Sequence, residues 1–124
     1  MVALIFLGGN PETKVIIMYI EQIKNGKAFM EIVSEVSRHK PVVALKAGSS
    51  ARGQAAAASH TGSLSGSYDV YVEAFRKSGV LLVHTLTGAF LAAEMLSHPK
   101  RYPKGRRAIV VTNAGGFAVL SSDY

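Results

Sequence analysis

A histidine inside a loop of small side chains is the residue of this sequence best suited to covalent chemistry. The loop reads Ser-His-Thr-Gly-Ser at 59–63, with His60 as its imidazole. Histidine ionises near neutral pH and forms covalent intermediates by nucleophilic attack. A phosphoryl group on a ring nitrogen needs hydrogen-bond donors that add no bulk, and glycine and serine amides fit this need. We therefore interpret His60 as a candidate phosphoryl carrier, with an ordinary exposed loop histidine as the alternative.

A glutamate and a glycine-rich turn are the other candidates for chemistry. Glu21 directly follows an apolar run at 15–20. A carboxylate there can accept a hydrogen bond from one imidazole nitrogen, which fixes the tautomer and leaves the other nitrogen free to attack. The turn Thr-Asn-Ala-Gly-Gly at 112–116 follows another apolar run, and a helix that starts there presents backbone amides to an anion. A solvated strand-end acid and a tight turn remain the alternatives.

Two other nucleophile and nucleotide motifs are incomplete. Gly-Ser-Leu-Ser-Gly at 62–66 resembles a nucleophile elbow, but Leu64 stands at its centre and no strand precedes it. Gly-Ser-Ser-Ala-Arg-Gly at 48–53 has the glycine spacing of a P-loop, but Gln54 and Ala55 replace the required Lys and Ser/Thr. The four histidines lack metal-ligand spacing and the chain has no cysteine, so we expect no metal site.

The elements that must position these residues alternate between strand and helix. Four apolar runs rich in β-branched residues predict strands of a parallel sheet, at 15–20, 42–46, 80–83 and 108–112. Helical periodicity predicts helices over 27–39, from an N-cap at Ser67 to residue 77, and from an N-cap at Thr87 to before Pro99. This alternation predicts an α/β fold with helices on both faces of the sheet. For the first nine residues, periodicity favours a strand.

The position of the small-residue segment adds to the case for function. Residues 47–66 contain almost only small and polar side chains, and such a long segment in a compact domain is usually functional. Like the turn at 113–116, it follows a strand directly. Ligands of parallel α/β sheets bind beyond the carboxyl ends of the strands. We therefore expect both segments at one functional edge of the sheet.

Composition and charge limit the class of protein. The 124 residues are 48% hydrophobic, which suits one domain with a sizeable core. Fourteen Lys and Arg against eight Asp and Glu give a net charge of +6, which favours partners such as phosphates, nucleotides or nucleic acid. Part of that charge lies at 98–107, where Pro and Gly favour a linker over a nucleic-acid arm. No apolar run has membrane-spanning length and no cysteine is present, so we expect a cytoplasmic protein without a membrane partner.

Four segments taken together resemble the nucleoside-diphosphate-forming acyl-CoA synthetases, a family that includes ADP-forming acetyl-CoA synthetase α chains and relatives of succinyl-CoA synthetase. The segments are Lys-Pro-Val-Val-Ala-Leu-Lys-Ala-Gly at 40–48, Ala-Ser-His-Thr-Gly-Ser-Leu-Ser-Gly at 58–66, Ala-Phe-Arg-Lys-Ser-Gly-Val at 74–80 and Ala-Ile-Val-Val-Thr-Asn-Ala-Gly-Gly at 108–116. The resemblance implies a flavodoxin-like ligase domain at 1–104 and the start of a second, truncated flavodoxin-like domain at 105–124. It also implies that the first nine residues are the tail of a helix.

The same resemblance assigns roles to the candidate residues. It implies that His60 is phosphorylated between two half-reactions that connect an acyl phosphate with ADP, and that Glu21 orients it. The residues implied to bind phosphate are Ser59, Thr61, Gly62, Asn113, Ala114, Gly115 and Gly116. Phe117 departs from the proline that is more usual after this last glycine.

The resemblance also implies what this chain works with. No cofactor is expected to bind tightly, because CoA, ADP or ATP and Mg²⁺ act through CoA-binding and ATP-grasp domains or subunits that these residues do not include. We therefore expect the isolated chain to lack full ligase activity and to form a homo-oligomer through exposed strand edges. Nucleic acid is not expected as a partner. The alternative is a non-catalytic regulatory or binding module of the same ancestry, such as the ligase-like part of a fused protein acetyltransferase.

Overall fold

The chain folds as a parallel α/β domain followed by a separate C-terminal helix. The structure is a computed structural model that describes residues 1–55, 67–98 and 105–123. Its elements, in chain order, are α1 (Val2–Gly9), β1 (Ile16–Ile20), α2 (Gly26–Ser37), β2 (Val42–Lys46), α4 (Tyr68–Lys77), β3 (Leu81–Val83), α5 (Leu86–Leu96) and α6 (Gly115–Ser122). The alternation expected from the sequence is therefore confirmed between β1 and α5.

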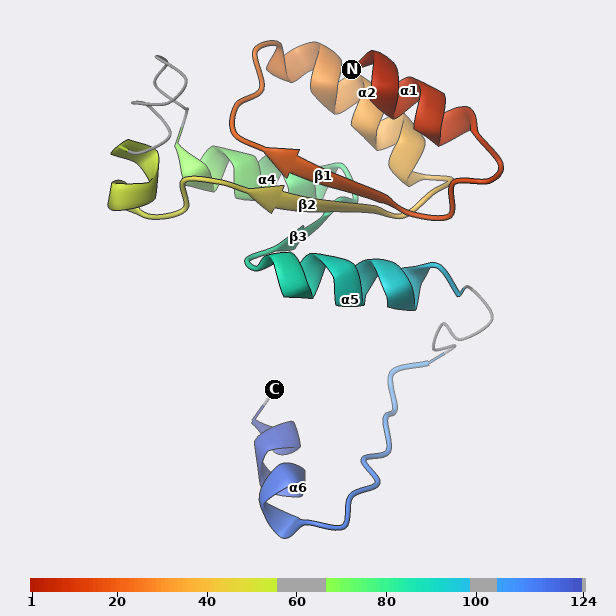
Figure 1. Cartoon of the computed structure of the whole chain (residues 1–124), viewed down its shortest axis with the longest axis vertical. Coiled ribbons are helices and arrows are strands. Elements are labelled where there is room, and N and C mark those ends of the chain that lie inside the picture. The colour runs from red at the N-terminus through yellow and green to blue at the C-terminus, as the bar shows by residue number, and fades with distance from the viewer. Residues whose placement is uncertain (56–66, 99–104, 124) are drawn as a thin grey trace.

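Three of the predicted strands form one sheet. The order is β1-β2-β3 and both pairings are parallel, with Ile16 opposite Val42 and Val43 opposite Leu81. All three strands point their carboxyl ends the same way because each connection crosses over through a helix. The side of the molecule toward which β1 and β2 point in Figure 1 is therefore the edge where the sequence places its functional loops.

Helices cover both faces of this sheet. Figure 1 shows α1 and α2 on one side and α5 on the other. The larger core lies under α2 and α4, where Val33 and Phe75 are fully buried and the Phe75 ring meets Phe29 edge-on at 6.3 Å. Because side chains alternate along a strand, Val43 points to the opposite face, and both it and Ala89 of α5 are fully buried. The predicted α/β class with helices on both faces is confirmed.

Helix boundaries reflect the capping groups that the sequence offers. The Asn25 side chain accepts a hydrogen bond from the Ala28 amide at 3.1 Å, so α2 starts one residue earlier than expected. The N-cap of α5 is Thr85, whose hydroxyl accepts from the Gly88 amide at 2.9 Å, and not Thr87 as predicted. A threonine caps where its oxygen reaches a free amide two or three residues ahead, and Thr85 is the one that does so.

Residues 2–9 form a helix with Met1 as its N-cap, so the strand favoured by periodicity is wrong and the helix implied by the family resemblance is right. An ammonium group closes this helix. Lys40 Nζ donates to the carbonyls of Leu7 at 2.7 Å and Asn10 at 2.6 Å. These carbonyls have no partner within the helix at its carboxyl end, and a cation satisfies them. Lys40 thus holds α1 on α2 although it lies more than thirty residues away in sequence.

The predicted strand at 108–112 is not present as a strand. These residues have no ladder partner among the described residues, and Ile109 and Val111 are 90% and 93% exposed. An apolar run becomes a strand only where a neighbouring strand supplies hydrogen bonds, and none of the described strands lies beside this run. The helix expected after the turn is present as α6, which starts at Gly115 with Ala114 as its N-cap. Among the described helices, none combines the length and the apolar composition that a membrane span requires.

Candidate functional site

Glu21 stands at the carboxyl end of β1. The parallel register places Ile20 opposite Lys46, the last residue of β2, and the Ala47 amide continues the ladder by donating to the Ile20 carbonyl at 2.9 Å. The backbone before Glu21 is therefore held in the sheet, while the residues after it turn toward α2. This is the placement predicted for Glu21 from the apolar run that precedes it.

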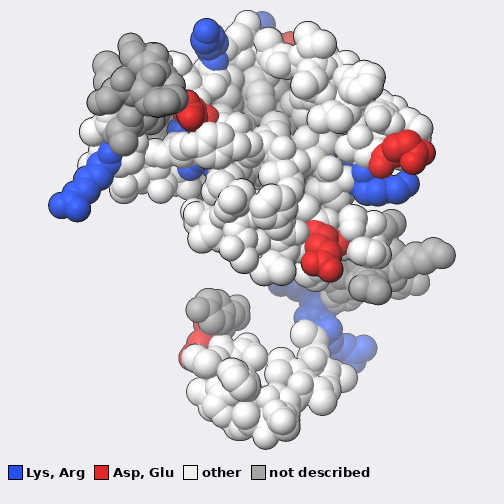
Figure 2. Space-filling model, in the orientation of Figure 1, with Lys and Arg blue, Asp and Glu red and all other residues white. Residues whose placement is uncertain are grey.

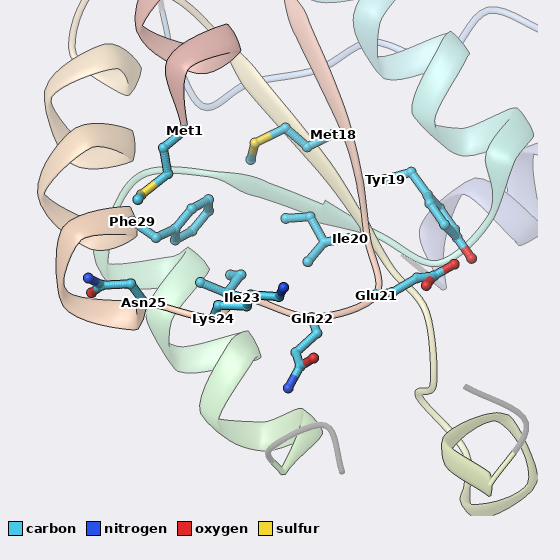
Figure 3. A pocket seen from close by; sticks show the side chains of 10 residues that line it. All are labelled: Met1, Met18, Tyr19, Ile20, Glu21, Gln22, Ile23, Lys24, Asn25 and Phe29. Carbon is cyan, nitrogen blue, oxygen red and sulfur yellow. The ribbon is translucent and has the colours of Figure 1, made fainter. Parts of the chain in front are cut away.

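An open pocket of about 1110 Å³ lies at this end of β1. It is lined by Met1, Met18, Tyr19, Ile20, Glu21, Gln22, Ile23, Lys24, Asn25 and Phe29. Figure 3 shows the apolar side chains of Met18 and Phe29 on one side of it, and the turn after β1 along its lower margin. The Glu21 carboxylate points away from them and toward the Tyr19 hydroxyl. Its oxygens therefore face away from the apolar lining of the pocket.

A buried cation lies behind the same edge. Lys46 is only 5% exposed, its Nζ donates to the Ala47 carbonyl, and it lies 4.6 Å from the centre of the Tyr71 ring. Burial lowers the pKa of the Lys46 ammonium below its ordinary value, and the nearby Glu21 carboxylate raises it by a smaller amount. The sheet edge therefore carries one carboxylate and one cation close enough for their charges to act on each other.

Tyr71 connects this cation to the turn that follows Glu21. Its hydroxyl accepts a hydrogen bond from the Ile23 amide at 3.3 Å, and its ring packs against Phe75 at 6.1 Å. The sequence pattern indicated no role for Tyr71 or for Lys46. A lysine that ends an otherwise apolar buried run was the signal available, because a charge there must be compensated. Its partners, which lie far away along the chain, could not be read from the sequence.

The histidine loop lies outside the described residues. His60, with Ser59, Thr61 and Gly62, falls between residues 55 and 67, so their predicted roles stay predictions. Upstream of it, Gly48 adopts a left-handed φ of 76°, and the Gly53 amide donates to Ser50 Oγ at 3.1 Å. Residues 51–55 are helical and lie on the side toward which β1 and β2 point.

The glycine-rich turn forms the expected helix start, but away from Glu21. The Ala114 amide donates to Thr112 Oγ1 at 3.1 Å, and α6 follows from Gly115. Figure 1 shows α6 apart from the sheet, and no residue of α6 is buried. The structure does not bring Asn113 or Gly116 beside Glu21, and the phosphate-binding role of residues 113–116 stays a prediction.

The described residues offer no metal-binding cluster, and the face drawn in Figure 2 carries no charged patch. No group of three or more His, Asp or Glu residues that could hold a metal ion occurs in residues 1–55, 67–98 and 105–123. Figure 2 shows instead a broad surface with few charged side chains, with Lys, Arg, Asp and Glu toward its margins. Large apolar side chains that are exposed on the described elements include Ile17 and Tyr19 of β1, and Phe90, Leu91 and Met95 of α5.

Comparison with known proteins agrees with this arrangement. The profile of the family described as "Succinyl-CoA ligase like flavodoxin domain" matches residues 3–96. The α subunit of the ADP-forming acetate–CoA ligase II of Pyrococcus furiosus is 48% identical over 118 residues, which are 95% of this chain and 25% of that subunit. An ADP-forming 4-hydroxybutyrate–CoA ligase of Nitrosopumilus maritimus is 36% identical over 119 residues, 94% of this chain and 17% of that protein.

A solved structure supports the same grouping. The acetyl-coenzyme A synthetase 1 of Candidatus Korarchaeum cryptofilum, in complex with phosphate and ADP, matches with a TM-score of 0.88 and 42% identity, over 98% of this chain and 26% of that one. The chain spans about a quarter of the length of the α subunits it matches. From the family profile over residues 3–96 and the fold of the sheet, we conclude that this chain belongs to the succinyl-CoA ligase-like flavodoxin domains of the nucleoside-diphosphate-forming acyl-CoA synthetases.

Proposed function

We propose that this chain is the phosphohistidine-bearing ligase domain of an ADP-forming acyl-CoA synthetase. The observation that carries the proposal is the position of Glu21 at the carboxyl end of β1. The same chain has a histidine in its small-residue loop. His60 would be the nucleophile and Glu21 the acid that orients it. The family membership supplies the reaction class, and these two residues supply the groups that the class needs.

The chemistry assigned to this chain is the transfer of one phosphoryl group through His60. In the first half-reaction, phosphate displaces CoA from an acyl-CoA and gives an acyl phosphate. The unprotonated nitrogen of His60 then attacks phosphorus, the N–P bond forms, and the P–O bond to the acyl carboxylate breaks. Glu21 accepts a hydrogen bond from the other ring nitrogen and stabilises its positive charge. An oxygen of the ADP β-phosphate then attacks phosphorus, the N–P bond breaks, and ATP and neutral histidine result.

Backbone amides are the groups proposed to hold the phosphoryl oxygens. Ser59, Thr61 and Gly62 flank the nucleophile, and residues 113–116 lead into the N-terminus of α6. Glycine and alanine leave the amides accessible, and a helix N-terminus favours negative charge. For residues 113–116 to lie beside Glu21, α6 must take a different place relative to the sheet from the one in Figure 1.

We propose that the other substrates bind to further domains or subunits of the same synthetase. CoA, ADP or ATP and Mg²⁺ would be held there, in the cytoplasm, where acyl-CoA and ADP are available. The apolar surface over β1 and α5 is suited to contact with such domains, because a surface of this kind is costly to leave in water. Homo-oligomerisation through exposed strand edges stays a prediction. Acetate is the proposed acid, since it is the acid for which the relatives at 46% and 48% identity are named.

Grafting tests the proposal. The matched segment of the Pyrococcus furiosus α subunit is replaced by this chain, the altered subunit is assembled into its synthetase, and ATP formation from acetyl-CoA, phosphate and ADP is measured with this graft. We expect an active graft, and a loss of several orders of magnitude in His60→Gln because no other group takes the phosphoryl. His84→Gln is the matched control, since His84 is exposed and contacts the Tyr68 hydroxyl at 3.3 Å. An inactive graft, or equal activity of the two variants, contradicts the proposal.

A further inference from the structure

Lys46 is the most deeply buried charged side chain among the described residues that the proposed mechanism does not use. It stands at the end of β2, beside Ile20, on the edge from which Glu21 projects. A lysine ammonium is strongly hydrated and has three donors, so its burial needs compensation. The compensation here comes from the Ala47 carbonyl and the face of the Tyr71 ring, whose centre is 4.6 Å away.

Both residues that contact the Lys46 ammonium also bind the backbone near Glu21, one before it and one after it. Ala47, which accepts from the Lys46 ammonium, donates its own amide to the Ile20 carbonyl at 2.9 Å, one residue before Glu21. Tyr71, which holds the ammonium against its ring, accepts from the Ile23 amide at 3.3 Å, two residues after Glu21. The segment that carries Glu21 is therefore anchored at both ends by groups that touch one ammonium.

Folding alone does not require this buried charge. The pKa of Lys46 is lowered because its burial penalises the ammonium by more than the attraction of Glu21 favours it. A buried cation of this kind adds little to stability, and an apolar side chain of similar length is often tolerated as well or better. Buried titratable groups with shifted pKa values are often found at functional sites.

From this geometry we infer that Lys46 and Tyr71 form a positioning pair that fixes the turn and the carboxylate of Glu21 for its work on the histidine. The inference rests on the proposed function, because it assigns the pair to the acid of that mechanism. Lys46 supplies the charge that attracts Glu21 and joins the two anchors of its turn. Tyr71 supplies the ring for the ammonium and the hydroxyl for the Ile23 amide.

A double-mutant cycle on the graft tests this inference. The rate at which ATP phosphorylates the protein in a single turnover is measured in four proteins: wild type, Lys46→Met, Glu21→Gln and the double variant. We expect Lys46→Met to slow phosphorylation about 10-fold without changing the KM for ATP, and to slow it less than about 2-fold when Glu21 is already Gln. A lysine that served only the fold would slow both backgrounds equally.

Two further variants sharpen the result. Tyr71→Phe keeps the ring but removes the hydroxyl that accepts a hydrogen bond from the Ile23 amide. We expect this variant to slow phosphorylation by a few-fold in the protein with Glu21, and not in the protein with Glu21→Gln. Lys77→Met removes an exposed lysine from the helix that carries Tyr71, and no change is expected. Equal slowing by Lys46→Met in both backgrounds, or no slowing at all, overturns the inference. A wild-type graft that is not phosphorylated at His60 instead overturns the proposed function.

Discussion

The core beneath the candidate site predicts a large difference between two phenylalanines. Phe75 of α4 is fully buried and contacts both Phe29 and Tyr71, while Phe90 of α5 is 60% exposed. Truncating a fully buried Phe to Ala costs about 3–5 kcal/mol, and each ring pair adds about 0.5–1.5 kcal/mol beyond buried area. We expect Phe75→Ala to lower the free energy of unfolding by about 4 kcal/mol. Phe90→Ala should change it by less than about 0.5 kcal/mol.

Urea denaturation followed by circular dichroism at 222 nm measures both values. For a slope of about 2 kcal/mol per molar urea, Phe75→Ala should lower the midpoint by about 2 M. Measurement at two low protein concentrations separates folding from association through the exposed apolar surface. A cost below about 1.5 kcal/mol for Phe75→Ala, or an equal cost for Phe90→Ala, would refute the packing described for α4 on α2.

Three other changes have outcomes that follow from single contacts. Lys40→Met removes the cation that caps α1, and thermal or urea unfolding should show a loss of about 1.5–3 kcal/mol; no loss would show that the cap is not formed. Asn25→Ala should cost about 1 kcal/mol by the same measurement, while Ser67→Ala, whose hydroxyl makes no capping bond, should cost clearly less. Burial lowers the pKa of Lys46 in the folded protein below the ordinary value of 10.5. Between these two pKa values the unfolded chain binds more protons than the folded one. The free energy of unfolding, measured relative to that of Lys46→Met, must therefore rise with pH in this range. The rise cannot exceed about 1.4 kcal/mol per pH unit, and parallel pH profiles of the two proteins would contradict it.

The parts of the fold that the sequence predicted correctly depend on local patterns. Strands β1 and β2 are short apolar runs bounded by polar or turn residues, and each lies within one residue of its predicted range. The predictions were wrong where a residue or strand far along the chain determines the secondary structure. Residues 2–9 are apolar enough for a strand, but Lys40 closes them as a helix. Residues 108–112 have strand composition, yet no described strand lies beside them to complete a ladder.

The candidate site was likewise predicted only where a local pattern was sufficient. Glu21 could be predicted because the end of a buried strand fixes the edge at which the next side chain emerges. The roles of Lys46 and Tyr71 could not be predicted, because their contacts join residues far apart in the sequence. Lys46 contacts the Tyr71 ring, 25 residues further along the chain, and the Tyr71 hydroxyl binds the Ile23 amide, 48 residues before it. The pattern shows only that a charge ends an apolar run. The contacts that give the charge its role exist only once α4 packs on the sheet.

The proposed relay is tested most directly by locating a phosphoryl group on the protein. The wild-type graft and its His60→Ala variant are incubated with ATP labelled in the γ-phosphate, and protein-bound label is then exposed to acid and to alkali. We predict label that survives alkali, is lost in acid, maps to the peptide containing His60 and is absent from the variant. Equal labelling of the two proteins, or label that is stable in acid, would contradict the account.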